Sequence, residues 1–154
     1  MEYLSLRQHE FETTLRVLQA YPEDKISIRP APKSRTAAEL AMVFASEERV
    51  IKVLVETGAT STQLPRLQVP DTMAGIISAW QEAVSANTAL LSKLTPAELE
   101  KVVDFYGLRV TLADALWIEL LDHIHHRGQF SVYLRLAGAR VPSIYGPTAD
   151  VIMG

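Results

Sequence analysis

The chain has 154 residues, a length that suits a single domain with one hydrophobic core. Its 15 Lys and Arg and 18 Asp and Glu give a formal net charge of -3, which is too mild and too mixed to favour a nucleic acid or a membrane surface as a partner. The absence of cysteine excludes disulfides, thiolate zinc sites and a cysteine nucleophile, so any metal must be held by nitrogen and oxygen ligands.

The N-terminal stretch is polar and charged, and no segment approaches the roughly 20 apolar residues that span a bilayer. We therefore expect a cytoplasmic, soluble protein with one domain over residues 1–154.

Four segments repeat apolar residues with the period of a helix. The first predicted helix runs from about Leu4 to Tyr21 and is ended by Pro22. The second starts at the capping box of residues 36–39 and runs to about residue 56, with Gly58 just beyond its end.

The third predicted helix begins near Asp71 or Thr72. Its expected inward stripe consists of Met73, Ile77, Trp80, Val84 and Leu91. A short helical turn at residues 95–98 leads to an irregular stretch over residues 104–109. The fourth helix runs from about Thr111 to Leu136 and stops at Gly138.

The C-terminal segment 141–147 is too rich in proline and glycine for a helix, and no convincing pair of alternating strands precedes it. The sequence therefore predicts an all-α fold, a four-helix bundle with a non-helical C-terminal tail. Facing helices of such a bundle can build a ligand or metal site in its interior.

Polar residues share the predicted core stripe of the fourth helix. At about 100° per residue, that stripe carries Ala115, Glu119, Asp122, His126, Phe130 and Tyr133. His123 falls on its flank, whereas His125 and Arg127 point away from it. In the second helix Glu47 faces the core and Glu48 does not.

A buried carboxylate needs a cation, a proton or a hydrogen-bond network. Asp122 and His126, four residues apart, are spaced to hold one metal ion, with Glu47 or Glu119 as a third ligand. The alternative is a network without metal, in which imidazolium His126 pairs with Asp122 and Glu119.

Gly128 interrupts the fourth helix although the apolar period continues beyond it. We expect another helix to approach closely at this glycine; a local kink is the alternative.

The run HHRGQFSVYLRLAG at residues 125–138, followed by VPSIYGPTAD at residues 141–150, closely resembles the DinB family, also called DinB/YfiT. The likeness continues upstream through residues 18–25, 32–36 and 40–41. It implies a four-helix bundle that often forms homodimers. It also implies a divalent metal, commonly nickel or zinc, bound by three histidines, one in the second helix and two at i and i+4 in the fourth.

The second of the fourth-helix histidines matches His126, and the first falls at Asp122. The second-helix histidine falls at Val43, or at Met42 if the register slips by one residue. Aspartate can ligate a metal and valine cannot, and Glu47, one turn beyond Val43, is the nearby acid placed to substitute.

The resemblance and the residues together favour a dimeric protein with a divalent-metal-dependent activity on a small molecule, of the hydrolase or thiol-transferase type. Glu47, Asp122 and His126 would hold the nickel or zinc ion. Glu119 or His123 would relay protons, and Tyr133 would orient the substrate.

The alternative is a noncatalytic dimeric bundle whose metal site is degenerate and which acts by binding a partner or ligand. A closed core beside His126 favours this alternative, and an open cleft there favours the enzyme.

Overall fold

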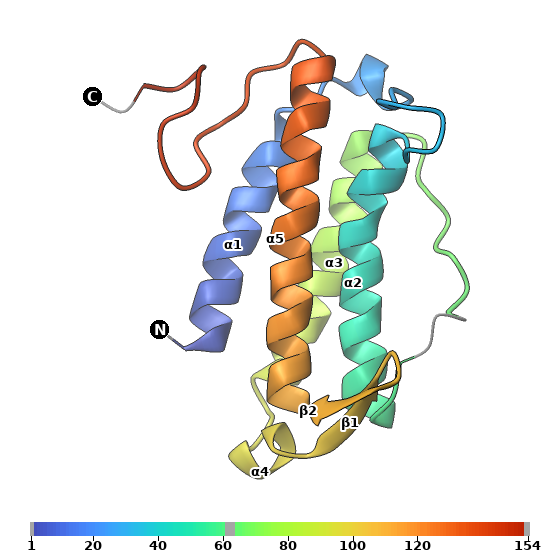
Figure 1. Ribbon diagram of the computed structural model, residues 1–154, viewed down its shortest axis with the longest axis vertical. Coiled ribbons are helices and arrows are strands. Elements are labelled where there is room, and N and C mark those ends of the chain that lie inside the picture. Colours follow the sequence, from blue (N-terminus) through green and yellow to red (C-terminus); the bar gives the residue numbers. More distant parts are fainter. Residues whose placement is uncertain (1, 61–63, 153–154) are drawn as a thin grey trace.

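The computed structural model describes residues 2–60 and 64–152, and these are mainly helical. The elements in chain order are α1 (Tyr3–Gln19), the 3-10 helix η1 (Glu23–Lys25), α2 (Ala37–Thr57), α3 (Met73–Leu91), α4 (Pro96–Leu99), β1 (Val102–Phe105), β2 (Leu108–Thr111) and α5 (Leu112–Leu136). The long helices α1, α2, α3 and α5 lie side by side, and α4 and the two strands gather at one end (Figure 1).

Local capping chemistry sets the ends of α2, as the sequence predicts. The Thr36 hydroxyl accepts from the Glu39 backbone N–H at 3.1 Å, and the Glu39 carboxylate accepts from the Thr36 N–H at 2.7 Å. Gly58 ends the helix with a φ of 73°, a left-handed conformation that glycine adopts without strain.

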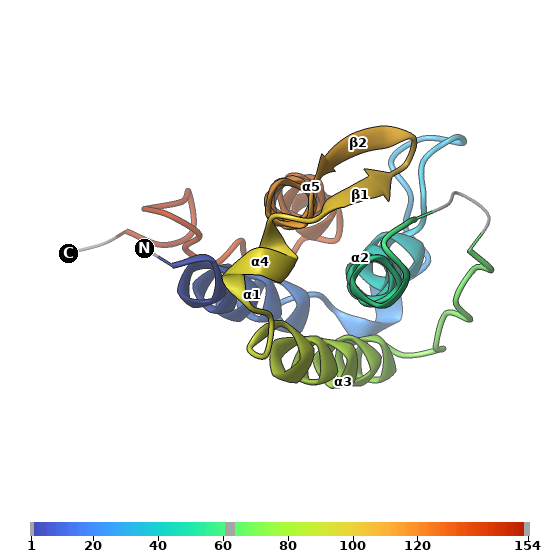
Figure 2. The ribbon, with the colours of Figure 1, turned by 90° about the horizontal axis from the view of Figure 1, so that it is seen from below.

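Each long helix packs against two others. Helix α2 packs against α3 and α5, and α1 packs against the same two helices, so α1 and α2 are diagonally opposed in the end-on view (Figure 2). The larger apolar cluster includes Leu18, Phe44, Trp80, Phe130 and Leu134. A second cluster, with Ile51 and Leu116, lies at the end that carries the strands. The expected inward residues Ile77 and Val84 of α3 are only half-buried, because the core face of α3 is centred on Ile76 and Trp80.

The sequence predicts an irregular stretch at residues 104–109 and no pair of strands, and both predictions are wrong. Strands β1 and β2 pair as an antiparallel hairpin, with Asp104 opposite Arg109. Tyr106 and Gly107 connect them with φ values of 52° and 87°, the positive pair required by a tight hairpin turn. Val103 and Phe105 are buried on one side, so the hairpin covers one end of the helices.

The core face of α5 is rotated from the predicted stripe. It is centred on His123 and Arg127, both buried, whereas the Asp122 side chain is 53% exposed. Glu48 of α2 is likewise buried rather than turned outward. Helical spacing alone predicts that Arg127 and Glu48 point outward, but partners from other helices satisfy their charges in the interior.

Within the described residues, no other helix makes the expected close approach to Gly128. The glycine is exposed, and a Cβ built on it would meet no described atom outside its own helical turn within 4 Å. Because the helix runs uninterrupted through this position, the glycine adds only backbone freedom.

Replacing Gly128 with alanine is therefore expected to raise the free energy of unfolding by about 1 kcal/mol. Urea unfolding at pH 7 measures the change. A loss of stability would show instead that something outside this chain, such as a second copy, packs against the glycine.

The segment after α5 is anchored by polar contacts. Val141 is buried in the core, and the Tyr145 hydroxyl donates to Glu10 Oε2 at 2.6 Å. Arg135 and Asp150 form an ion pair.

None of the helices in the described part of the chain combines the length and apolar character needed to cross a membrane.

Candidate metal centre and its cleft

Glu47 from α2 and Asp122 and His126 from α5 converge on one point. One ligand atom from each lies within 4.8 Å of the other two, so this triad could hold a metal ion. His126 Nδ1 lies 2.7 Å from Glu47 Oε1 and 3.6 Å from Asp122 Oδ2. The predicted set of three ligands is thus brought together, with Glu47 buried and Asp122 open to solvent.

The triad lies in an open cleft of about 570 Å³ between α2, α5 and the hairpin. Val43 and Tyr106 line the same cleft, and so does Glu119. Val43, unlike Met42, therefore occupies the cleft position at which the family resemblance expects a histidine. The core beside His126 is open, which is the arrangement that favours a small-molecule site.

The buried His123 connects Glu47 of the triad to Thr14 of α1. Its predicted position on the flank of the helix did not indicate this role. Its Nδ1 lies 2.9 Å from Glu47 Oε2, and its Nε2 lies 2.8 Å from the Thr14 hydroxyl of α1. Its ring stacks on Phe11 at a centroid distance of 4.4 Å. Neutral His123 with its proton on Nδ1 donates to Glu47, and its Nε2 accepts from the Thr14 hydroxyl when that single proton is not given to the Glu10 backbone carbonyl 3.1 Å away.

Burial changes the proton affinities of the triad. It raises the pKa of Glu47 to about 7, against the opposing hydrogen bond from His123. It lowers the pKa of His126, although the nearby Asp122 carboxylate opposes that change. Neutral imidazole is the form that ligates a metal, so this environment favours a ligating His126 at neutral pH.

Glu119 borders both the open cleft and a small internal cavity. It is 5% exposed, and its Oε2 has no hydrogen-bond partner among the described residues. Burial, followed by repulsion from Glu47 and Asp122, raises its pKa to about 8. Glu119 therefore carries a proton at neutral pH, and the carboxylates within 4 Å of His126 among the described residues are those of Glu47 and Asp122, not the Glu119 partner of the metal-free alternative.

The raised pKa of Glu119 gives stability a pH dependence with a definite sign. Because the native state holds this proton up to about pH 8, whereas the unfolded carboxyl loses it near 4.5, stability falls as pH rises between those values. We expect Glu119→Gln to remove this contribution, so that the wild type loses about 3 kcal/mol more than the variant between pH 5 and pH 8.

Urea unfolding of the metal-free protein at several pH values measures that difference. Glu100→Gln, a change at an exposed glutamate, serves as the matched control and should leave the wild-type slope unaltered. Parallel wild-type and Glu119→Gln curves would contradict the assignment of a proton to Glu119.

Tyr133 does not reach the triad cleft. Its hydroxyl donates to the backbone carbonyl of Arg35 at 2.8 Å, and its ring borders a neighbouring hollow that also contains Lys33 and Ser34. The predicted substrate-orienting tyrosine thus contacts the backbone of residue 35, which borders the triad cleft.

Two buried charge clusters had no signal in the sequence. Arg7 lies 2.5 Å from Glu48, whose carboxylate also accepts from Asn87 at 2.7 Å. Arg127 lies 2.7 Å from Glu10. Each cluster joins different helices, so no spacing within one helix could have identified it.

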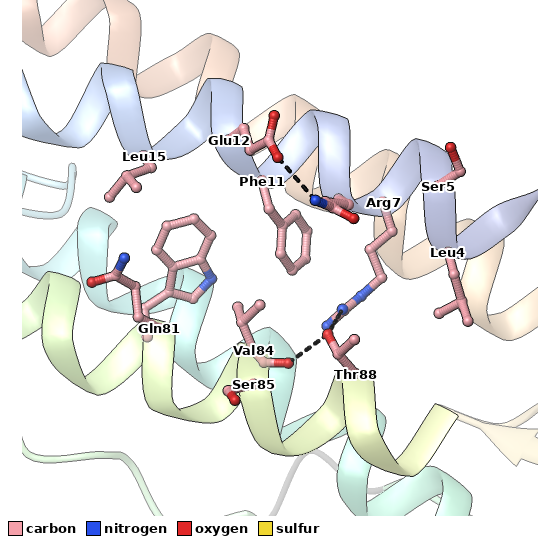
Figure 3. A pocket seen from close by; sticks show the side chains of 12 residues that line it. Leu4, Ser5, Arg7, Phe11, Glu12, Leu15, Gln81, Val84, Ser85 and Thr88 are labelled. Carbon is pink, nitrogen blue, oxygen red and sulfur yellow. Dashed lines mark hydrogen bonds between the residues drawn. The ribbon is translucent and has the colours of Figure 1, made fainter. Parts of the chain in front are cut away.

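A separate hollow of about 670 Å³ lies between α1 and α3 (Figure 3). Phe11, Leu15 and Val84 give it a largely apolar lining, and Arg7 extends along it to donate to the Thr88 hydroxyl. Although this hollow is larger than the triad cleft, the described residues that line it bring no group of metal-ligating side chains together. The triad cleft is therefore the better candidate for chemistry.

Comparisons with known proteins agree with this architecture. The sequence pattern of the DinB family matches residues 1–151. A crystal structure of a DinB-like protein from Bacillus cereus is 28% identical, covers 93% of this chain and 95% of that one, and superposes with a TM-score of 0.80.

Two Bacillus subtilis proteins also match. The uncharacterized protein YrdA is 24% identical over 151 residues, covering 96% of this chain and 89% of YrdA. The crystal structure of the DinB-like protein YjoA is 22% identical and has a TM-score of 0.75, covering 92% of this chain and 96% of that one, and indicates a shared fold.

Proposed function

The chain belongs to the DinB family, and from this membership we propose that its four long helices form a DinB-type bundle that carries a divalent-metal-dependent activity on a small molecule. The observation that carries the proposal is the convergence of Glu47, Asp122 and His126 in an open cleft. Hydrolysis and transfer to a thiol are the two reaction types that such a centre suits.

The three side chains fit nickel or zinc. One imidazole nitrogen and two carboxylate oxygens are donors that both metals accept, and the open cleft leaves room for further ligands. A bound ion would supply Lewis-acid activation of a water or a thiol cosubstrate. Asp122, on the solvent side, would complete the set at the mouth of the cleft.

Residues around the triad have distinct proposed roles. Glu119, which keeps its proton near neutral pH, is placed to donate it to a leaving group in the cleft. His123 and Thr14 act as positioning residues, since their hydrogen bonds hold the Glu47 carboxylate from behind. His123 is too deeply buried to meet a substrate itself.

Metal analysis of protein purified without a histidine tag tests the proposal. We expect one nickel or zinc ion per chain after incubation and dialysis, with the other metal competing for the same site. Absence of bound metal after soaking with either ion would contradict the proposal.

One observation favours the noncatalytic alternative, a bundle with a degenerate site. Glu47 already lies within hydrogen-bonding distance of both His123 and His126, so the network is satisfied by protein groups alone. If that network is only structural, His126→Ala changes stability and leaves every ligand affinity unaltered.

A further inference from the structure

Arg35 lies where three hollows meet. It borders the triad cleft, the hollow beside Tyr133, and a third cleft of about 500 Å³ that opens along the first half of α2. The third cleft, here called the basic cleft, is lined by the basic side chains of Arg29, Lys33, Arg35 and Arg66. Val43 and Ser46 line both the basic cleft and the triad cleft, so the two are neighbours along α2.

The charge of the basic cleft departs from that of the whole chain. Four basic side chains line it in a protein whose net charge is -3. The acidic residue in its lining is Glu39, whose carboxylate accepts from the Thr36 backbone N–H. Arg29 lies 3.7 Å from the same carboxylate, which leaves Lys33, Arg35 and Arg66 to concentrate positive potential there.

Specific contacts fix the backbone that carries these side chains. Tyr133 donates to the carbonyl of Arg35, and the Ala37 N–H donates to the Ile28 carbonyl at 2.8 Å. On the other side, Arg49 of α2 donates to the carbonyl of Pro65, next to Arg66. The basic side chains are thus presented from anchored segments, and Arg35 directly precedes the N-terminus of α2, whose dipole also favours an anion.

We propose that the basic cleft binds the anionic group, a carboxylate or a phosphate, of a small organic molecule whose other end extends past Arg35 to the Glu47, Asp122 and His126 triad. Arginine pairs with both anions through parallel charge-assisted hydrogen bonds. The claim that an anion binds follows from the residues of the basic cleft alone. The claim that the other end of the molecule reaches the triad rests on the proposed metal-dependent function.

Binding of simple anions to the metal-free protein tests the first half. Methyl phosphate and acetate are titrated separately while amide chemical shifts are recorded by NMR. We expect saturable shifts centred on residues 29–35 for at least one anion, and the tighter of the two identifies the group. Arg35→Glu should weaken this binding about tenfold or more, the effect of losing one charge-assisted contact.

Matched variants distinguish a specific anion site in the basic cleft from a general attraction of anions to positive charge. Lys33→Glu should also weaken binding, whereas Lys93→Glu, the same change beyond the far end of α3, should not. Arg66→Glu provides an independent variant should Arg35→Glu fail to fold. Equal effects of Lys33→Glu and Lys93→Glu, or binding only of long polyanions such as heparin, would overturn the proposal.

Variants of this kind also test the anion-binding proposal independently of the proposed metal site. Arg66→Glu and Tyr133→Phe should leave nickel affinity within about threefold of the wild type, because neither residue lines the triad cleft. Anion binding without metal binding would reject the metal-dependent function and keep the basic cleft. Metal binding without any anion binding would reject the basic cleft alone.

Discussion

Replacing Arg127 with methionine is expected to lower the free energy of unfolding by about 3–5 kcal/mol. The Arg127 side chain is 1% exposed and joins α5 to α1 and to the C-terminal segment. It lies 2.7 Å from Glu10 Oε2, donates to the Glu10 carbonyl at 2.9 Å and donates to the Tyr145 hydroxyl at 2.5 Å. Methionine fills a similar volume but leaves the Glu10 carboxylate buried beside an apolar side chain.

Two further variants separate loss of charge pairing from loss of packing. Adding Glu10→Leu to Arg127→Met removes the stranded carboxylate and should restore most of the stability. Tyr145→Phe removes only a hydroxyl and should cost about 1 kcal/mol. Urea unfolding measures all three, and a loss below about 1 kcal/mol for Arg127→Met would mean that the pair contributes little to the folded state.

The helix ends were predictable because the signals that set them are local. The Thr36 and Glu39 capping box and the Gly58 stop lie within a few residues of the ends they define. The three residues of the triad could be predicted for a related reason. Asp122 and His126 are one helical turn apart, so a single correct guess about the facing residue, Glu47, completes the set.

The burial of α5 was not predictable from its own sequence. His123 and Arg127 are buried because they meet Thr14 and Glu10 of α1, more than 100 residues earlier in the chain. The predicted stripe is centred on His126, which places Asp122 inward and Arg127 outward. Long-range ion pairs decide the orientation, and they have no sequence period.

The hairpin escaped prediction for a different reason. Each strand has four residues, too few for alternation to stand out from chance. Its turn uses Tyr106 and Gly107, with a non-glycine residue at positive φ, rather than the common Asn-Gly pair. The hairpin is fixed instead by its docking on α2, where the Asp104 N–H donates to the Gly58 carbonyl at 2.9 Å.

Replacing Glu47 with glutamine is expected to weaken nickel or zinc binding by about 100-fold, the largest loss for any single member of the triad. The change removes an anionic oxygen ligand and leaves one acceptor oxygen where two carboxylate oxygens contact His123 and His126. Since burial raises the pKa of Glu47 to about 7, metal must displace a proton there, and wild-type affinity should rise between pH 6 and pH 8. Calorimetric titration with nickel at three pH values measures both effects.

Glu119→Gln is the decisive control for the ligand set, because Glu119 is the other acid in the cleft that could serve as the third ligand. If Glu47 ligates the ion, Glu119→Gln should keep nickel affinity within about threefold of the wild type while altering the pH dependence of stability. A loss as large as that of Glu47→Gln would move the third ligand to Glu119. Near-normal nickel affinity of Glu47→Gln would show that the ion does not depend on the Glu47 carboxylate. Glu47 and its partner His123 would then have a structural role only.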